Sequence, residues 1–89
     1  MKSLDPYSVI RFPLSTEKAI RMMEAENKLV VVVDVRASKE DIKKAAETIL
    51  KAKIVAVNTQ ITPKGLKKAY LKFAPDVLAM DIATNLGIL

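Results

Sequence analysis

The feature of this chain that most constrains its fold is a predicted β-hairpin between residues 53 and 73. Residues 53–62 are rich in β-branched side chains, and from residue 68 to 73 polar and apolar side chains alternate. Between them, Pro63 presets φ for the first corner of a turn, and Gly65 can take the left-handed conformation that closes a three-residue turn. The two segments are therefore predicted to pair as neighbouring antiparallel strands.

The second strand of this hairpin divides into an apolar face and a basic face. Side chains alternate across a strand, so Ala69, Leu71 and Phe73 share a face that suits a hydrophobic core. The opposite face is basic, aromatic and basic in turn: Lys68, Tyr70 and Lys72.

Positive charge is concentrated on and beside the hairpin. The formal net charge is +5, yet residues 48–74 carry six basic and no acidic residues, which leaves nine basic against ten acidic residues elsewhere. The six are Lys51, Lys53, Lys64, Lys67, Lys68 and Lys72. A local positive potential attracts a polyanion, and an unstacked base can lie on an aromatic ring. The pattern indicates nucleic-acid binding, although exposed lysines on a strand also discourage edge pairing.

Size and composition limit the other classes of protein. The 89 residues suffice for one domain with a modest core, and a hydrophobic fraction of 51% excludes general disorder. Without cysteine or histidine, disulfides, thiolate zinc sites and Cys- or His-based nucleophiles are excluded. Two glycines and scattered carboxylates indicate neither a phosphate-cradling loop nor a magnesium site. We therefore expect no enzyme, no metal and no cofactor, and no apolar run is long enough for a membrane span.

One helix and one strand are predicted before the hairpin with clear signals. The helix begins at Ser15 or Thr16, whose hydroxyls can cap free N–H groups, and ends at about Asn27. Residues 28–36 are predicted to form a strand, because four consecutive valines resist a helix through their stiff χ1 angles. One face of this strand would carry Leu29, Val31, Val33 and Val35.

Two more helices complete the predicted elements. Ser38 and Asp41 resemble a capping box at the start of a helix that has a regular apolar stripe. The stripe consists of Ile42, Ala45, Ala46, Ile49 and Leu50. Further on, Pro75-Asp76 is predicted to break the chain and cap a last helix over about residues 77–86. The final two apolar residues, Ile88 and Leu89, are expected to pack back onto the domain.

The lead-in to the first helix allows two interpretations. Residues 7–12 fit either a short strand or one helical turn, and Val9, Ile10 and Phe12 are expected to pack on the domain.

A right-handed crossover makes the strands that flank the second helix parallel, and the last strand fits between them. The predicted fold class is α+β, a small antiparallel or mixed sheet of three to four strands with helices packed on one face, as in split β-α-β, ferredoxin-like folds. Lys68, Tyr70 and Lys72 would then lie at the centre of an open face.

Five short segments, in order and at familiar spacing, resemble the large-subunit ribosomal protein twenty-three family over nearly the whole chain. They are Ser15-Thr16-Glu17-Lys18-Ala19, Asn27-Lys28-Leu29, Asp41-Ile42-Lys43, Val57-Asn58-Thr59 and Lys67-Lys68-Ala69-Tyr70-Leu71-Lys72. The resemblance implies a single rRNA-binding domain, residues 1–89, in the cytoplasm on the large ribosomal subunit beside the exit of the peptide tunnel. Its implied partners are large-subunit rRNA, neighbouring ribosomal proteins, and the signal recognition particle or other nascent-chain factors, with Glu17 matching an acidic docking residue. The short connection at residues 63–66 looks like the archaeal and eukaryotic form of the family.

The predicted RNA-binding residues combine cations, hydrogen-bonding side chains and one aromatic ring. Lysines would neutralise phosphates, amides and hydroxyls would bind phosphate or 2′-OH groups, and the tyrosine would stack or hydrogen-bond. The set is Lys53, Asn58, Thr59, Gln60, Thr62, Lys64, Lys67, Lys68, Tyr70 and Lys72.

Two other functions remain open at this point. Residues 64–70 loosely resemble the central-strand signature of the RNA recognition motif, but Leu66 and Lys68 stand where that module has aromatic residues, and no fourth strand is evident. A small-ligand or acylphosphatase-like domain would need a phosphate-cradling arginine beside an asparagine, and Arg36 and Asn58 do not form an obvious constellation.

Overall fold

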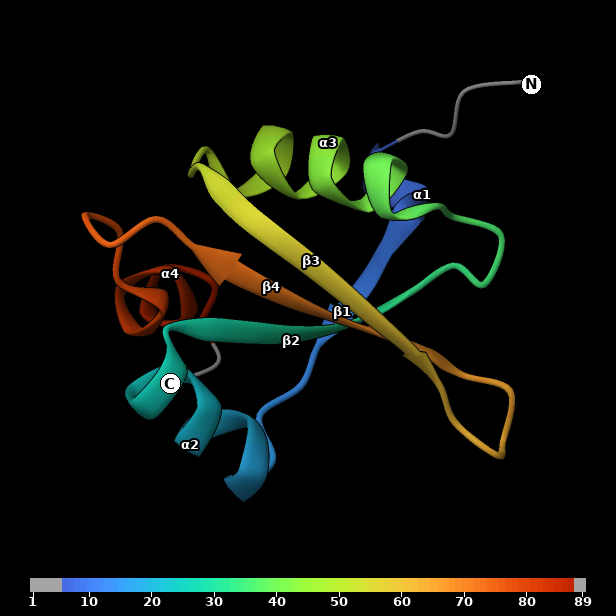
Figure 1. Ribbon diagram of the computed structural model, residues 1–89, viewed down its shortest axis with the longest axis horizontal. Helices are drawn as coiled ribbons and strands as arrows, with labels where there is room; N and C mark the ends of the chain where they lie inside the picture. Colours follow the sequence, from blue (N-terminus) through green and yellow to red (C-terminus); the bar gives the residue numbers. More distant parts are fainter. Residues whose placement is uncertain (1–5, 88–89) are drawn as a thin grey trace.

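The computed structural model describes residues 6–87, which form a four-stranded sheet with helices around it (Figure 1). In chain order the elements are α1 (Pro6–Val9), β1 (Ile10–Pro13), α2 (Glu17–Glu26), β2 (Lys28–Val33), α3 (Lys39–Leu50), β3 (Ile54–Ile61), β4 (Lys67–Phe73) and α4 (Ala79–Asn85). None of the helices in residues 6–87 is both long enough and apolar enough to cross a bilayer.

The sheet confirms the predicted α+β class and the position of the hairpin. The strand order is β1-β2-β4-β3, and every neighbouring pair is antiparallel. β4 lies between β2 and β3, as the crossover argument requires. The hairpin closes where Thr62 N donates to the carbonyl of Leu66 at 2.8 Å, around three residues that include Gly65 at φ 84°.

The lead-in segment contains both of the alternatives considered for it. α1 supplies the helical turn, and β1 supplies a fourth strand that pairs with β2. Val9 is buried, whereas Phe12 is 48% exposed, so the expectation that Phe12 packs on the domain is wrong. In the register, Phe12 lies opposite Val32, on the face of the sheet that points away from the core.

The predicted strand over residues 28–36 is too long by three residues. β2 ends at Val33, and the chain then turns, with Ala37 N donating to the carbonyl of Asp34 at 3.0 Å. Val35 is 52% exposed and does not continue the buried face. The strand ends here because arginine side chains surround the buried Asp34 carboxylate, an arrangement that alternation alone does not reveal.

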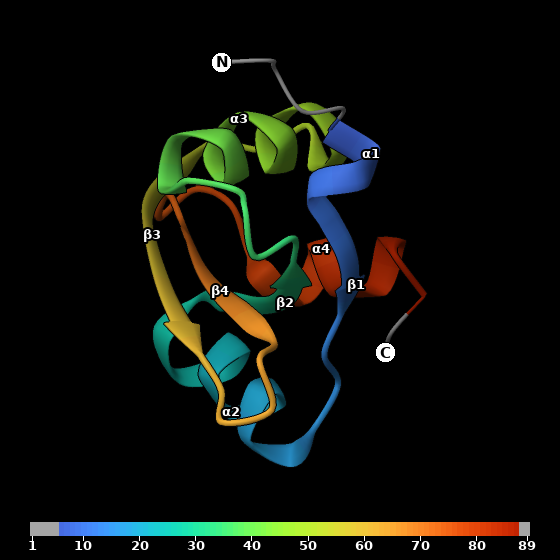
Figure 2. The ribbon, with the colours of Figure 1, turned by 90° about the vertical axis from the view of Figure 1, so that its right-hand side faces the viewer.

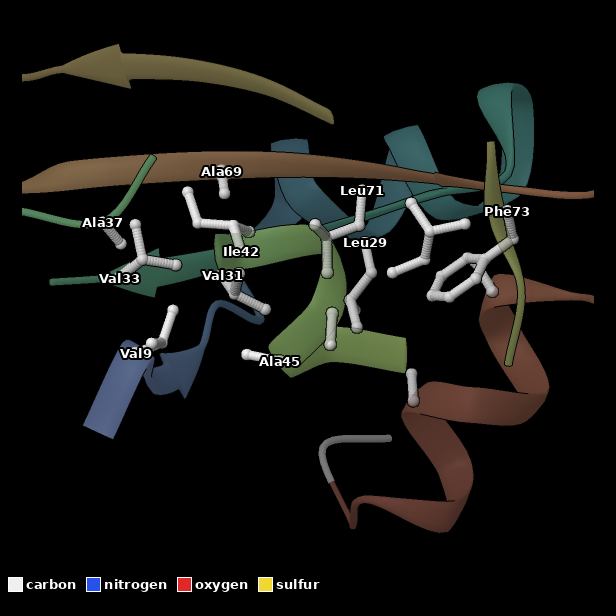
Figure 3. Packing of buried hydrophobic residues seen from close by; sticks show 14 of the residues in the cluster. Val9, Leu29, Val31, Val33, Ala37, Ile42, Ala45, Ala69, Leu71 and Phe73 are labelled. Atoms are coloured by element: carbon white, nitrogen blue, oxygen red, sulfur yellow. The ribbon is translucent and has the colours of Figure 1, made fainter. Parts of the chain in front are cut away.

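The core lies on one face of the sheet and contains side chains from the strands and from the helices (Figure 3). Leu29, Leu71 and Phe73 of the strands pack there with Ile42 of α3 and Ala79 of α4. Each large apolar side chain buried in this way contributes about 1.5–3 kcal/mol relative to exposure. The predicted cap of α3 is confirmed, since Ser38 and Asp41 make both bonds of a capping box.

The last helix begins later than predicted and is capped differently. α4 spans Ala79–Asn85, and Asp76 makes no cap; instead the side-chain oxygen of Asn27 accepts from Ala79 N at 2.7 Å. The Asn27 amide also donates to the carbonyls of Ala74 at 3.3 Å and Val77 at 2.7 Å. One residue therefore joins the end of α2 to the segment that leads into α4. The expected packing of Ile88 and Leu89 lies outside the described residues.

The second face of the sheet is only partly open. Val30 and Val32 of β2 point away from the core, yet both are buried. Ala19 and Met22 of α2 line a cavity together with Val30, so α2 borders this face along β2. Figure 2 shows β3 and β4 running together to the hairpin turn, where Thr62 and Pro63 line the same cavity as Thr16 and Lys18. The solvent-exposed part of the face therefore lies mainly on β3 and β4, with Phe12 of β1 exposed at the opposite edge.

Candidate nucleic-acid interface

Six residues of β3 and β4 share the exposed part of this second face, which we call the polar face. Three cross-strand pairs in the register define it: Ala56 with Lys72, Asn58 with Tyr70, and Gln60 with Lys68. Directly opposite residues lie about 5 Å apart, so the two ammonium groups, two amides and one phenol form a continuous patch. Five of the predicted RNA-binding residues are thus brought together: Asn58, Gln60, Lys68, Tyr70 and Lys72.

Tyr70 is held in place at the centre of the polar face. Its hydroxyl donates to Oε1 of Gln60 at 3.0 Å, across the diagonal between β4 and β3. The side chain is half-buried and borders a cavity of about 230 Å³ between α2 and the hairpin. A preoriented ring beside two lysines offers a stacking surface and cations within the reach of one nucleotide.

The cavity beside Tyr70 adds two residues that sequence reasoning missed. Thr16 and Lys18, at the start of α2, line it together with Lys68 of β4. Thr16 was interpreted only as a possible helix cap, and Lys18 only as part of the Ser15–Ala19 segment. No local signal connects them to the hairpin, because only the packing of α2 against β2 brings them there.

The other predicted residues lie off the polar face. Lys67 points to the core side, where its Nζ donates to the carbonyl of Ala37 at 2.6 Å. Thr59 pairs with the buried Ala69 in the register, and the Thr62 hydroxyl accepts from Leu66 N to close the turn. Lys64 lies in the turn itself and Lys53 precedes β3, so they stand at opposite ends of the hairpin.

The hairpin lysines are not neutralised by carboxylates of the fold. The ion pairs found within residues 6–87 involve four other basic residues: Arg11, Arg21, Lys28 and Arg36. Lys68 and Lys72 take part in none of them. Their positive charge is therefore available to an external anion.

A buried carboxylate organises the arginines at the end of β2. Asp34 is 4% exposed and accepts from Arg36 Nε at 3.1 Å, Nη2 at 2.8 Å and the backbone N at 2.9 Å. Arg11 Nη2 lies 3.9 Å from the same carboxylate. The side-chain hydrogen bonds from Arg36, and then its backbone hydrogen bond, hold the pKa of Asp34 well below its usual range. Arg11 and Arg36 thus have a structural role in shaping the turn after β2.

Acid is expected to destabilise the protein through Asp34. Because its pKa is lower in the folded than in the unfolded chain, the stabilisation is complete above about pH 4 and is lost as the pH falls towards the folded pKa. Urea unfolding at about pH 7 and about pH 3 should show a smaller acid-induced loss for Asp34→Asn than for the unmodified protein. Equal losses in the two proteins would contradict this role. Some acid dependence should remain in the variant, because the capping bond with Ser38 also lowers the pKa of Asp41.

Glu17 lies at the first position of α2, where its carboxylate suits the positive end of the helix dipole. Its side chain is 80% exposed and accepts from Arg21 Nη2 at 2.6 Å. Exposed pairs of this kind contribute little to stability, so the carboxylate remains accessible to another molecule.

A comparison with protein-family models identifies a family that this chain matches. The family model described as Ribosomal protein L23 matches residues 8–77, from within α1 to just before α4. The matched segment includes the whole of the β3–β4 hairpin and the start of α2. These are the elements that build the polar face and its adjoining cavity.

Proposed function

Because this chain belongs to the ribosomal protein L23 family, a family of structural, non-enzymatic components of the large ribosomal subunit, we propose that it binds large-subunit rRNA through the polar face. The observation that carries this proposal is the placement of Lys68 and Lys72 on either side of Tyr70, without carboxylate partners. We place the bound protein in the cytoplasm, on the ribosome near the exit of the peptide tunnel, as one rRNA-binding domain beside neighbouring ribosomal proteins.

The proposed mechanism is electrostatic, with hydrogen bonds and stacking that fix the position of the RNA. Lys68 and Lys72 neutralise phosphates and release counterions. Lys64, in the hairpin turn, and Lys18, beside the cavity at the start of α2, extend the positive track. The amides of Asn58 and Gln60 bind phosphate or 2′-OH groups, and the Tyr70 ring stacks on an unpaired base. Lys67 stabilises the loop before α3 and does not take part.

Salt dependence tests the proposal directly. Each phosphate contact contributes a slope of about 0.7–0.9 when the logarithm of the binding constant is plotted against that of salt concentration. For four lysine contacts, binding to large-subunit rRNA fragments should weaken with a slope of about 3. A flat dependence would contradict phosphate neutralisation, and co-sedimentation with large subunits at moderate and high salt would check the same point on the assembled particle.

We also propose that Glu17 forms part of a docking site for the signal recognition particle or other nascent-chain factors. Its exposed carboxylate at the start of α2 supports this, because it is directed away from the core and can accept from a basic side chain. Glu17→Gln should weaken recruitment of the factor to large subunits and leave rRNA binding unchanged. Unchanged recruitment would contradict the role of Glu17 without affecting the proposal for the polar face.

A further inference from the structure

A second hollow lies at the other end of α2 and meets the polar face at Lys72. It has a volume of about 570 Å³ and lies between the last turn of α2 and the start of α4. These two helices are neighbours in the fold (Figure 1). Its apolar lining includes Met23, Phe73, Leu78 and Met80. We call this hollow the α2–α4 groove. Leu78 is 57% exposed, so the groove presents a large apolar side chain to solvent.

The walls of the groove are held together by hydrogen bonds. Asn27 lines the groove, and its side chain bonds to the backbone of three residues between β4 and α4. These bonds fix the spacing of the two helices before any partner arrives. A preformed site of this kind loses less conformational freedom on binding than one that must be assembled.

Acidic side chains outnumber basic ones around the α2–α4 groove, in contrast to the hairpin. Glu24 and Glu26 lie in the last turn of α2, which carries no basic residue, at the negative end of the helix dipole. Carboxylates at this end destabilise a helix by roughly 0.3–1 kcal/mol each. Residues 73–87 on the other wall contain Asp76 and Asp81 and no basic residue. The cations nearby come from the sheet: Lys72, which lines the groove, and Lys28, which pairs with Glu26 at 3.2 Å.

We propose that the α2–α4 groove docks a segment of a partner protein that presents apolar side chains flanked by basic residues. Leu78 and Met80 supply the accessible apolar surface over the buried Met23 and Phe73, and the flexible Met80 side chain can adapt to different shapes. The carboxylates of Glu24 and Glu26 then attract the flanking cations, which accounts for acidic residues where the helix dipole disfavours them. An RNA partner is disfavoured, because the same carboxylates repel phosphates. This site goes beyond rRNA binding and is separate from Glu17, at the opposite end of α2.

A designed peptide tests the proposal with the full-length protein. The probe is a helical peptide with leucines at i, i+3, i+4 and i+7 and two arginines at each end, compared with a peptide in which glutamates replace the arginines. In ¹⁵N spectra of the protein, the arginine peptide should shift the backbone signals of residues 23–27 and 78–80, and the glutamate peptide should not. Glu24→Lys and Leu78→Asp should each weaken binding of the arginine peptide about tenfold.

Matched variants separate the groove from general charge effects. Glu40 at the start of α3 is exposed like Glu24, and neither forms an ion pair within residues 6–87, so Glu40→Lys should leave peptide binding unchanged. Leu66→Asp, in the hairpin turn, is the corresponding control for Leu78→Asp. Equal binding of both peptides, shifts centred on the polar face, or no saturation at millimolar peptide would each overturn the proposal. Glu24→Lys should retain salt-dependent rRNA binding, so failure of the groove leaves the proposed function standing.

Discussion

Replacing Lys68 and Lys72 together by glutamate is expected to weaken binding of large-subunit rRNA about 100-fold at roughly 0.1 M salt. Both side chains lie on the polar face without a carboxylate partner, so reversal removes two phosphate contacts and adds two repulsive charges. The salt dependence of binding should also become shallower by about two phosphate contacts. Filter binding or fluorescence anisotropy across a range of salt concentrations measures both quantities.

The matched control places the same charge change on the other side of the molecule. Lys43 and Lys44 are exposed on α3, which packs against the core face of the sheet. The shortest extent of the molecule is 21 Å, about twice the Debye length at 0.1 M salt, so charges on opposite faces are largely screened from each other. Lys43→Glu with Lys44→Glu should therefore change rRNA affinity much less. An equal loss from both double variants would show that only net charge matters and that the polar face is not the contact surface.

Asn27→Ala is expected to lower the free energy of unfolding by roughly 3 kcal/mol. Three hydrogen bonds from one side chain would be lost. The carbonyl of Val77 and the N–H of Ala79 would lose their partner, whereas the carbonyl of Ala74 still accepts from Val77 N. Asn27 also has φ 56°, a left-handed conformation that alanine adopts at a cost of about 1–2 kcal/mol. Urea unfolding monitored by circular dichroism measures the change.

Two glycine variants separate the backbone contribution from the hydrogen bonds. Asn27→Gly removes the strain of the left-handed conformation but not the loss of the bonds, so it should still destabilise the protein by roughly 2 kcal/mol. Lys51, at the end of α3, has φ 54° and makes no side-chain hydrogen bond within residues 6–87. Lys51→Gly should therefore be neutral or slightly stabilising. If Asn27→Gly were equally neutral, Asn27 would be an ordinary helix end and not the link between α2 and α4.

Local patterns predicted those elements whose signals are complete within a few residues. The hairpin follows from Pro63, Gly65 and the alternation of β4, and α3 follows from the capping box at Ser38. The start of α4 could not be predicted in this way, since its cap comes from Asn27, 52 residues earlier in the chain. The end of β2 also involves a contact that is distant in sequence, because Asp34 N donates to the carbonyl of Val9 at 2.8 Å, beside the pairing of β1 with β2.

The candidate site shows the same division between local and long-range information. Alternation along β4 was sufficient to place Lys68, Tyr70 and Lys72 on one face. The same alternation places Lys67 on the side of Ala69, which is the core side. Lys67 was nevertheless included among the predicted RNA-binding residues because of its positive charge. Lys18 could not be connected to the hairpin from sequence, because its place beside the cavity depends on how α2 packs against β2.

Photo-crosslinking in the assembled large subunit tests the central claim most directly. A photoreactive amino acid at position 58, in the exposed centre of β3, lies on the polar face beside Tyr70, whereas one at position 43 lies on α3 across the core. We predict crosslinks from position 58 to large-subunit rRNA, and few or none from position 43. Crosslinks to rRNA from position 43, with none from position 58, would contradict the assignment of the polar face as the RNA-binding surface.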